Sequence, residues 1–275
     1  MNRPLKALAL TGALAAGSLA ASPDAAAAQL AALTGDRSLV VITTVGPNAP
    51  RVLRRLEVGT AAPLAGIDSR AADGLLYGVT TDGQIVTIDR RTGAATASGT
   101  LTLPLPGVQL SVDINPVADA IRIVGTDGSN LRHAFATGTT FADTSLNFPA
   151  PPAPPNPFGD AAPDVVGVAY TNTIPGANVP GTTATQLIDI DANPQALYLQ
   201  VPANSGTLNA IGRVTGGTLG SPLGFDIFVN SNGRNTGLIV TGNRLLTIDV
   251  IGGEILGSAR VRGLNAPVRD VAALL

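Results

Sequence analysis

The chain has 275 residues, of which 45% are hydrophobic and 13% charged, with 17 basic side chains against 19 acidic ones. This composition excludes an intrinsically disordered chain, because the apolar content and the length are sufficient for a sizeable core. Cysteine is absent and His133 is the only histidine, which excludes thiol nucleophiles, disulfides, thiolate zinc sites and multi-histidine metal sites.

Residues 1–28 have the features of a secretory signal peptide. Arg3 and Lys6 give a positive start, residues 7–21 are mostly apolar, and three alanines at 26–28 supply a cleavage site before Gln29. A membrane anchor is the alternative, but the apolar run of about 15 residues is shorter than the roughly 20 that span a bilayer. We therefore expect a secreted or periplasmic protein without a stable membrane anchor after cleavage.

The charge of the cleaved chain bears on its partners. Cleavage removes Arg3, Lys6 and Asp24, so that 17 basic and 19 acidic groups become 15 and 18, with a net charge of −3. This balance argues against nucleic acid as a partner. A small molecule, a glycan or a protein is expected instead.

The rest of the chain repeats a pattern of short strands joined by tight turns. Asp82-Gly83 and Asp127-Gly128 each separate two apolar runs, and this dipeptide is typical of a β-hairpin because its turn needs positive φ. The same frame recurs in residues 29–58, 75–101, 121–133, 186–191 and 238–261.

A short apolar lead-in segment accompanies the copies. Five such segments occur, at residues 64–68, 110–113, 166–170, 223–226 and 267–270. They recur at intervals of roughly 40 to 60 residues, which is the size of a four-stranded propeller blade.

The two ends of the chain complete one another in this pattern. The last lead-in segment is followed by no further strands, whereas residues 29–58 contain three strands and no lead-in segment. Pairing the two removes exposed sheet edges. The sequence therefore predicts one all-β domain, residues 29–275, a five-bladed β-propeller of four-stranded antiparallel blades closed by N-terminal strands that complete the C-terminal blade. Six blades remain the alternative if residues 193–214 contain additional strands.

Helices and long loops are the remaining elements. No stretch after residue 28 has sustained helical periodicity, so almost no helix is expected. Residues 149–163 contain seven prolines and predict an extended surface connection between the second and third blades. Residues 173–185 form a second Gly/Pro-rich loop.

Several motifs along the chain resemble a known family. They are Val112-Asp113-Ile114-Asn115-Pro116, Asp119-Ala120-Ile121-Arg122-Ile123-Val124, Ser129-Asn130-Leu131-Arg132, Leu146-Asn147-Phe148, Ala169-Tyr170-Thr171-Asn172, Leu187-Ile188-Asp189-Ile190-Asp191 and Asn204-Ser205-Gly206-Thr207-Leu208-Asn209. In order and spacing these resemble the bacterial domain-of-unknown-function 4394 family. The resemblance implies an exported, propeller-like protein whose activity is not established, so that no catalytic residue can be transferred. The chain departs from the family in its proline tract at 149–157.

Acidic residues of the lead-in segments are the first candidate site. Asp68, Asp113, Asp226 and Asp270 are predicted to occupy the same place in four of five innermost strands, and Ala169 occupies it in the fifth. Like positions surround the propeller axis, so these carboxylates, with Asn115 nearby, could hold Ca²⁺ or Mg²⁺. The alternative is structural, with each aspartate accepting hydrogen bonds from the backbone of the next blade.

Polar residues of the family-like motifs are the second candidate site. Guanidinium and amide groups could bind a carboxylate, a phosphate or a sugar. The candidates are Arg122, Asn130, Arg132, Asn147, Tyr170, Asn172 and Asn209. Alternatively, Arg122 could form a buried ion pair with Asp113 or Asp119.

Two function classes follow from these candidates. The first is a non-catalytic, exported propeller that binds a ligand or partner, or is structural; the scarcity of His, Glu and Cys favours it. The second is a divalent-metal-dependent hydrolase or lactonase with its ion on the axis, where Lewis acidity would activate water or a carbonyl. Convergence of the aspartates on one point is the feature that separates the two.

Overall fold

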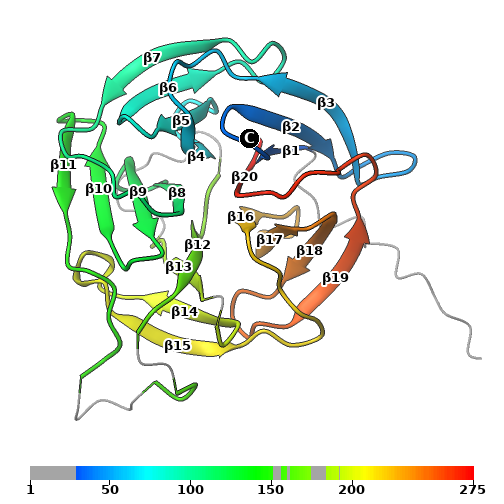
Figure 1. Cartoon of the computed structure of the whole chain (residues 1–275). Coiled ribbons are helices and arrows are strands. Elements are labelled where there is room, and N and C mark those ends of the chain that lie inside the picture. The colour runs from blue at the N-terminus through cyan, green and yellow to red at the C-terminus, as the bar shows by residue number, and fades with distance from the viewer. Residues whose placement is uncertain (1–28, 151–155, 160–161, 175–183, 192) are drawn as a thin grey trace, which may run out of the picture.

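Five separate four-stranded antiparallel sheets surround a common axis (Figure 1). The computed structural model describes residues 29–150, 156–159, 162–174, 184–191 and 193–275. Within them, a single turn of 3₁₀ helix, η1 (Ala203–Ser205), is the only helical element, and no helix has the length and apolar character needed to cross a membrane. The fold is the predicted five-bladed β-propeller.

Four blades are each built from strands that follow one another in the sequence. Blade 1 comprises β4 (Leu64–Ser69), β5 (Leu76–Thr80), β6 (Gln84–Ile88) and β7 (Ala95–Thr100). Blade 2 comprises β8 (Leu110–Asn115), β9 (Ala120–Gly125), β10 (Asn130–Ala134) and β11 (Thr139–Ala142). Blade 3 comprises β12 (Val165–Tyr170), β13 (Leu187–Asp191), β14 (Ala196–Gln200) and β15 (Leu208–Arg213). Blade 4 comprises β16 (Leu223–Val229), β17 (Asn235–Thr241), β18 (Arg244–Ile248) and β19 (Ile255–Arg260).

The closing blade joins the two ends of the chain, as predicted. Its order is β20-β1-β2-β3, with bounds β20 (Asp270–Ala273), β1 (Gln29–Leu33), β2 (Ser38–Thr43) and β3 (Arg51–Glu57). The antiparallel pair of β1 and β20 runs from Leu30 opposite Ala273 to Leu33 opposite Asp270. The C-terminal strand is thus the innermost strand of a sheet whose other strands are N-terminal, which closes the ring.

The core lies between the blades rather than within them. Each innermost strand (β4, β8, β12, β16 and β20) neighbours the next around the ring. Apolar side chains of adjacent sheets interdigitate there; Val79 and Ile85 of blade 1, for example, pack in one cluster with Val112, Ile121 and Ile123 of blade 2. Both faces of an inner strand are therefore buried, which explains why the lead-in segments are continuous apolar runs rather than alternating ones.

Two sequence interpretations need correction, and others lie outside the described residues. Residues 193–214 contain β14 and β15, which complete blade 3, so the six-bladed alternative is wrong. The frame that residues 186–191 share with residues 75–101 is out of step, because residues 186–191 contain β13, the second strand of blade 3, whereas the matching Ile88-Asp89 lies at the end of β6, the third strand of blade 1. Residues 1–28, which are predicted to be a signal peptide, residues 151–155 and 160–161 of the proline-rich connection, and residues 175–183 of the second loop lie outside the described residues.

Described parts of the proline-rich connection touch blade 3. The segment runs between β11 and β12, hence between blades 2 and 3, as predicted. The Phe158 ring lies edge-on to the Tyr198 ring with centroids 5.8 Å apart. This end of the connection is therefore packed on blade 3.

Glycines in the inner strands let neighbouring blades approach closely. A Cβ added to Gly66 would lie 2.4 Å from Val112 Cγ2 and 2.6 Å from Asp270 Oδ2. Gly167 and Gly224 are equally crowded, against Phe225 and Val271. A side chain at these positions would force adjacent blades apart, because protein interiors are close-packed.

We therefore expect Gly66→Ala to lower the free energy of unfolding by about 1–3 kcal/mol through overpacking. Urea unfolding followed by circular dichroism measures this. Gly107→Ala is the matched control, since a Cβ there meets nothing within 4 Å. Its stability should be unchanged or raised by up to about 1 kcal/mol. Equal losses in the two variants would contradict close packing at the inner strands.

Candidate functional site

Each of the four axial aspartates accepts a backbone hydrogen bond from the following blade. The bonds run from Ile114 N–H to Asp68 (2.7 Å), from Tyr170 N–H to Asp113 (3.1 Å), from Ala273 N–H to Asp226 (2.6 Å) and from Ile67 N–H to Asp270 (2.9 Å). We call these four carboxylates the blade fasteners. They cross four of the five seams between blades, so the structural alternative for the acidic residues is realised.

The fifth seam, between blades 3 and 4, has Ala169 in place of an aspartate. It is held instead by a reciprocal amide pair: Asn172 N–H donates to Asn235 Oδ1 at 2.7 Å, and Asn235 Nδ2 donates to Asn172 Oδ1 at 2.9 Å. The predicted ligand residue Asn172 therefore closes the ring where no fastener is available.

The four fasteners lie at two levels along the axis, not one. Each aspartate accepts its hydrogen bond from the residue that follows the equivalent position in the next inner strand. Applied around the ring, this rule places Asp68, Asp113, Ala169, Asp226 and Ala272 at one level. By the same rule Asp270 lies level with Gly66, two residues before Asp68 in β4. The prediction that Asp270 lies level with the other three aspartates is wrong by two residues. Ala272 is the residue of β20 at that level.

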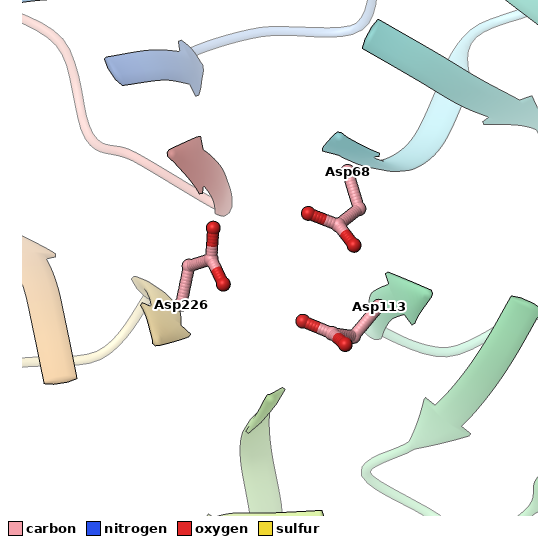
Figure 2. Close-up of side chains that lie close together, drawn as sticks. All are labelled: Asp68, Asp113 and Asp226. Atoms are coloured by element: carbon pink, nitrogen blue, oxygen red, sulfur yellow. The ribbon is translucent and has the colours of Figure 1, made fainter. Parts of the chain in front are cut away.

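Three fasteners converge on the axis, and we call Asp68, Asp113 and Asp226 the axial triad. Their side chains point toward one another from β4, β8 and β16 (Figure 2), and one oxygen of each lies within 4.8 Å of the others. Each residue is at most 4% exposed. Asp270 is outside this group, and so is Asn115, whose Oδ1 accepts the N–H groups of Val117 (2.9 Å) and Ala118 (2.8 Å) in the turn after β8.

The axial triad is strained electrostatically. Burial raises the pKa of Asp68 and Asp113 well above the usual value, and repulsion from the other triad carboxylates raises them further. Burial raises the pKa of Asp226 to about 7, against the opposing effect of the N–H groups of Ala273 and Ile227. Burial also raises the pKa of Asp270. Either protons or a cation can relieve this repulsion, and three carboxylate oxygens suit the hard ions Ca²⁺ and Mg²⁺.

Arg122 is the centre of the second group and is 1% exposed. Its Nη1 donates to Asn130 Oδ1 (2.6 Å) and Asp143 Oδ2 (2.8 Å), its Nη2 to Asn204 Oδ1 (2.9 Å) and its Nε to Tyr170 Oη (3.3 Å). The structure thus brings three of the predicted ligand residues, Arg122, Asn130 and Tyr170, together. The bonds to Asn130 and Asp143 lie within blade 2, and those to Tyr170 and Asn204 join blade 2 to blade 3.

The ion partner of Arg122 differs from both sequence candidates. Asp143, which follows β11, pairs with Arg122 at 2.8 Å and with Arg132 at 3.2 Å. Asp119 pairs instead with Arg70, and Asp113 belongs to the axial triad. Asp143 had no sequence signal, because it lies in a loop outside every repeated motif.

Arg132 joins the Arg122 group through Asp143, whereas Asn147, Asn172 and Asn209 lie outside it. Asn147 Nδ2 donates to the carbonyl oxygens of Ser145 and Ser205, both at 2.9 Å. Asn209 Nδ2 donates to the Val201 carbonyl oxygen at 3.2 Å. These amides, like Asn172, bind backbone or another amide and stabilise connections between strands.

Asp189 is a buried acid that the sequence interpretation did not single out as functional. It is 0% exposed, and neither carboxylate oxygen has a hydrogen-bond partner in the described residues. Burial raises its pKa well above the usual value, although the charge of Arg122 acts in the opposite direction. Without a hydrogen bond, the neutral acid is the form that this site favours.

The raised pKa values predict an unusual pH dependence of stability. A carboxyl whose folded pKa exceeds its unfolded value stabilises the protein below the unfolded pKa, and this contribution is lost as pH rises through the folded pKa. For Asp226 the interval runs from 3.8 to about 7. We expect the free energy of unfolding to fall by an amount on the order of 1–3 kcal/mol between about pH 5 and about pH 8.

Asp113→Asn tests the cause. Asp113 Oδ1 accepts a hydrogen bond from Tyr170 N–H, and an asparagine oxygen can still accept this bond while the charge is removed. Urea titrations of both proteins across this pH range should give a smaller fall for Asp113→Asn. An identical fall in the two proteins would exclude the triad as its origin.

The comparisons with known proteins concern family and fold only. No curated protein matches the chain. Among solved structures, the chain is similar to a protein of unknown function from Bacteroides caccae, with 9% sequence identity, a TM-score of 0.43, and coverage of 87% of this chain and 76% of that chain. The model of the family described as domain of unknown function (DUF4394) matches residues 38–272, from the start of β2 to β20. The chain therefore belongs to the domain-of-unknown-function 4394 family.

Proposed function

We propose that this protein is an exported, non-catalytic β-propeller that serves as a binding module. The observation that supports it most is the use of its polar groups. The blade fasteners accept backbone bonds across four seams, and the guanidinium of Arg122 is committed to four side chains. Groups that could do chemistry are thus engaged in holding the blades together.

His133 fits the same proposal. It is 3% exposed, its Nδ1 lies 3.0 Å from Thr140 Oγ1, and burial lowers its pKa. A general base must reach its substrate, directly or through one water molecule. A buried imidazole that is bonded to the adjacent strand is better suited to fastening β10 to β11.

Export and partner class rest on the sequence. Residues 1–28 have the order of regions of a signal peptide, and Gln29, the residue expected after cleavage, is the first residue of β1. The negative charge of the cleaved chain disfavours nucleic acid. A small molecule, a glycan or a protein of the cell envelope or medium remains the proposed partner.

The non-catalytic assignment predicts no turnover of ester substrates. Purified residues 29–275, incubated with p-nitrophenyl acetate and δ-valerolactone in the presence of Ca²⁺, Mg²⁺ or Mn²⁺, should hydrolyse them no faster than Asp113→Asn does. Release of nitrophenol and opening of the lactone are followed by absorbance and by pH titration. Metal-dependent turnover that disappears in Asp113→Asn would replace this proposal by the hydrolase.

A divalent-cation site at the axial triad is the second candidate. The observation that favours it is the approach of three buried carboxylates to within 4.8 Å of one another. Asp68, Asp113 and Asp226 would hold Ca²⁺ or Mg²⁺, and the ion would supply Lewis acidity to a substrate or would simply neutralise the triad.

This candidate predicts a pH-linked response to ions, because a cation and protons compete for the same oxygens. Millimolar Ca²⁺ or Mg²⁺ should raise the midpoint of thermal unfolding relative to EDTA at about pH 8, and much less at about pH 5, where protons already neutralise the triad. Asp113→Asn should reduce the rise at the higher pH. No rise in wild type, or an equal rise in Asp113→Asn, would exclude an ion at the axial triad.

A further inference from the structure

A pocket of about 290 Å³ opens at the face of the propeller where the inner strands begin. Its walls include Ala65 in β4, Leu110 in β8 and Arg269, which immediately precedes β20. Three consecutive blades around the ring therefore contribute to it. The pocket contains neither an axial-triad residue nor a member of the Arg122 group.

Gln109 gives this pocket an unused hydrogen-bond donor. Its side-chain Nε2 is shielded from solvent and has no hydrogen-bond partner in the described residues, and the residue lines the pocket. An unpartnered buried donor costs on the order of 1–3 kcal/mol, so folded proteins retain few of them. The amide must turn toward the pocket to meet a ligand acceptor, which would then satisfy it.

Arg269 adds a positive charge to the pocket, and hydrogen bonds to the backbone fix one side of its guanidinium. Its Nη2 donates to the carbonyl oxygens of Gly35 (2.7 Å) and Leu64 (3.3 Å). Within the described part of the chain, no carboxylate forms an ion pair with it, and its Nε and Nη1 atoms make no hydrogen bond. A guanidinium that is anchored on one side and open on the other is suited to an anion, above all a planar carboxylate.

The other walls limit the ligand to a small organic molecule. Val108 and Leu110 are apolar, as are Leu105, Pro106 and Ala65, while Thr81 provides a hydroxyl at the rim. A volume of about 290 Å³ lies at the lower end of ligand pockets, which span roughly 300–1,000 Å³. Two donors beside an apolar wall fit a carboxylate joined to a short carbon skeleton better than a bare inorganic anion.

We propose that this pocket binds a small organic carboxylate, with Arg269 and Gln109 as the carboxylate-binding residues. The inference rests on the proposed binding function and gives it a site and a ligand class. An acidic sugar and a short-chain fatty acid present the same carboxylate, and they differ in whether hydroxyl groups or methylene groups face the apolar wall.

Calorimetric titration of residues 29–275 tests the proposal with four probes: D-glucuronate, butyrate, inorganic phosphate and uncharged D-glucose. We expect saturable heat from at least one of the two carboxylates and none from glucose. The stronger carboxylate identifies the source as sugar-derived or aliphatic. Binding of phosphate alone, or of none of the probes, would overturn the assignment.

Variants locate the binding. Gln109→Glu replaces the donor by an acceptor of nearly the same shape and places a negative charge beside the carboxylate, so affinity should fall by roughly tenfold or more. Val108→Phe fills the pocket from a position that is 38% exposed and should also abolish binding. Arg234→Gln is the control, because Arg234 lines a different pocket of about 360 Å³, next to Thr171 at the opposite ends of the inner strands.

Unchanged affinity in both folded pocket variants, or a loss in the control equal to theirs, would refute the site. The outcome is separable from that of the proposed function. Ester turnover that depends on Asp113 would refute the non-catalytic assignment and leave the pocket untouched. Binding of some other partner with no response to either carboxylate would refute the pocket and leave the binding module intact.

Discussion

The hydrogen bond from an inner-strand carboxylate to the backbone of the next blade is the contact on which ring closure depends. Blades pack mainly through non-directional apolar contacts, which hold them together without specifying how far one inner strand slides past the next. A carboxylate aimed at one N–H group does specify it. Asp68, Asp113 and Asp226 fix one level around the axis, and Asp270 fixes another across the seam between the two ends of the chain. The glycines at Gly66, Gly167 and Gly224 are the steric counterpart, since they permit the approach that these bonds require.

The same arrangement creates the electrostatic problem at the axis. Fasteners of blades 1, 2 and 4 point inward, so fixing the relative positions of the blades at three seams gathers three carboxylates within 4.8 Å. Buried charges at this separation repel strongly. Burial raises the pKa of all three carboxyls, and repulsion adds to the rise for Asp68 and Asp113. Ala169 and Ala272 at the two other aligned positions keep the number of acids at three. A proton or a cation on the axis is therefore a requirement of the fold before it is an indication of catalysis, which is why convergence alone does not make an enzyme.

The sequence predicted the fold correctly where a residue pattern is compatible with only one local structure. Asp-Gly turns, apolar lead-in segments and the unmatched ends were enough to predict five blades and their closure, because positive φ and full burial restrict the residues allowed. It failed where the partner of a residue is set by three-dimensional packing. Asp270 ends its lead-in segment as Asp226 does, yet it lies one pleat earlier, and only the hydrogen bond to Ile67 reveals this. The acid that pairs with Arg122 is Asp143, from a loop with no repeat signature. A repeat aligns strands, whereas it carries no information about the contacts that loop residues make.

Hydrogen bonds within the protein distinguish the polar groups that stabilise the fold from those available to a ligand. Arg122, Asn130 and Asn172 are bound to protein groups, which accounts for their place in the fold without any ligand. Asp189 and Gln109 both have unpartnered buried atoms, but they differ in surroundings. Asp189 is 0% exposed and can become neutral by keeping a proton, which avoids a buried charge without any ligand. An amide N–H₂ cannot shed its donors in this way, and Gln109 lines a pocket beside a guanidinium. The donor that cannot be neutralised thus belongs to a pocket residue, whose amide need only turn to meet a molecule from outside.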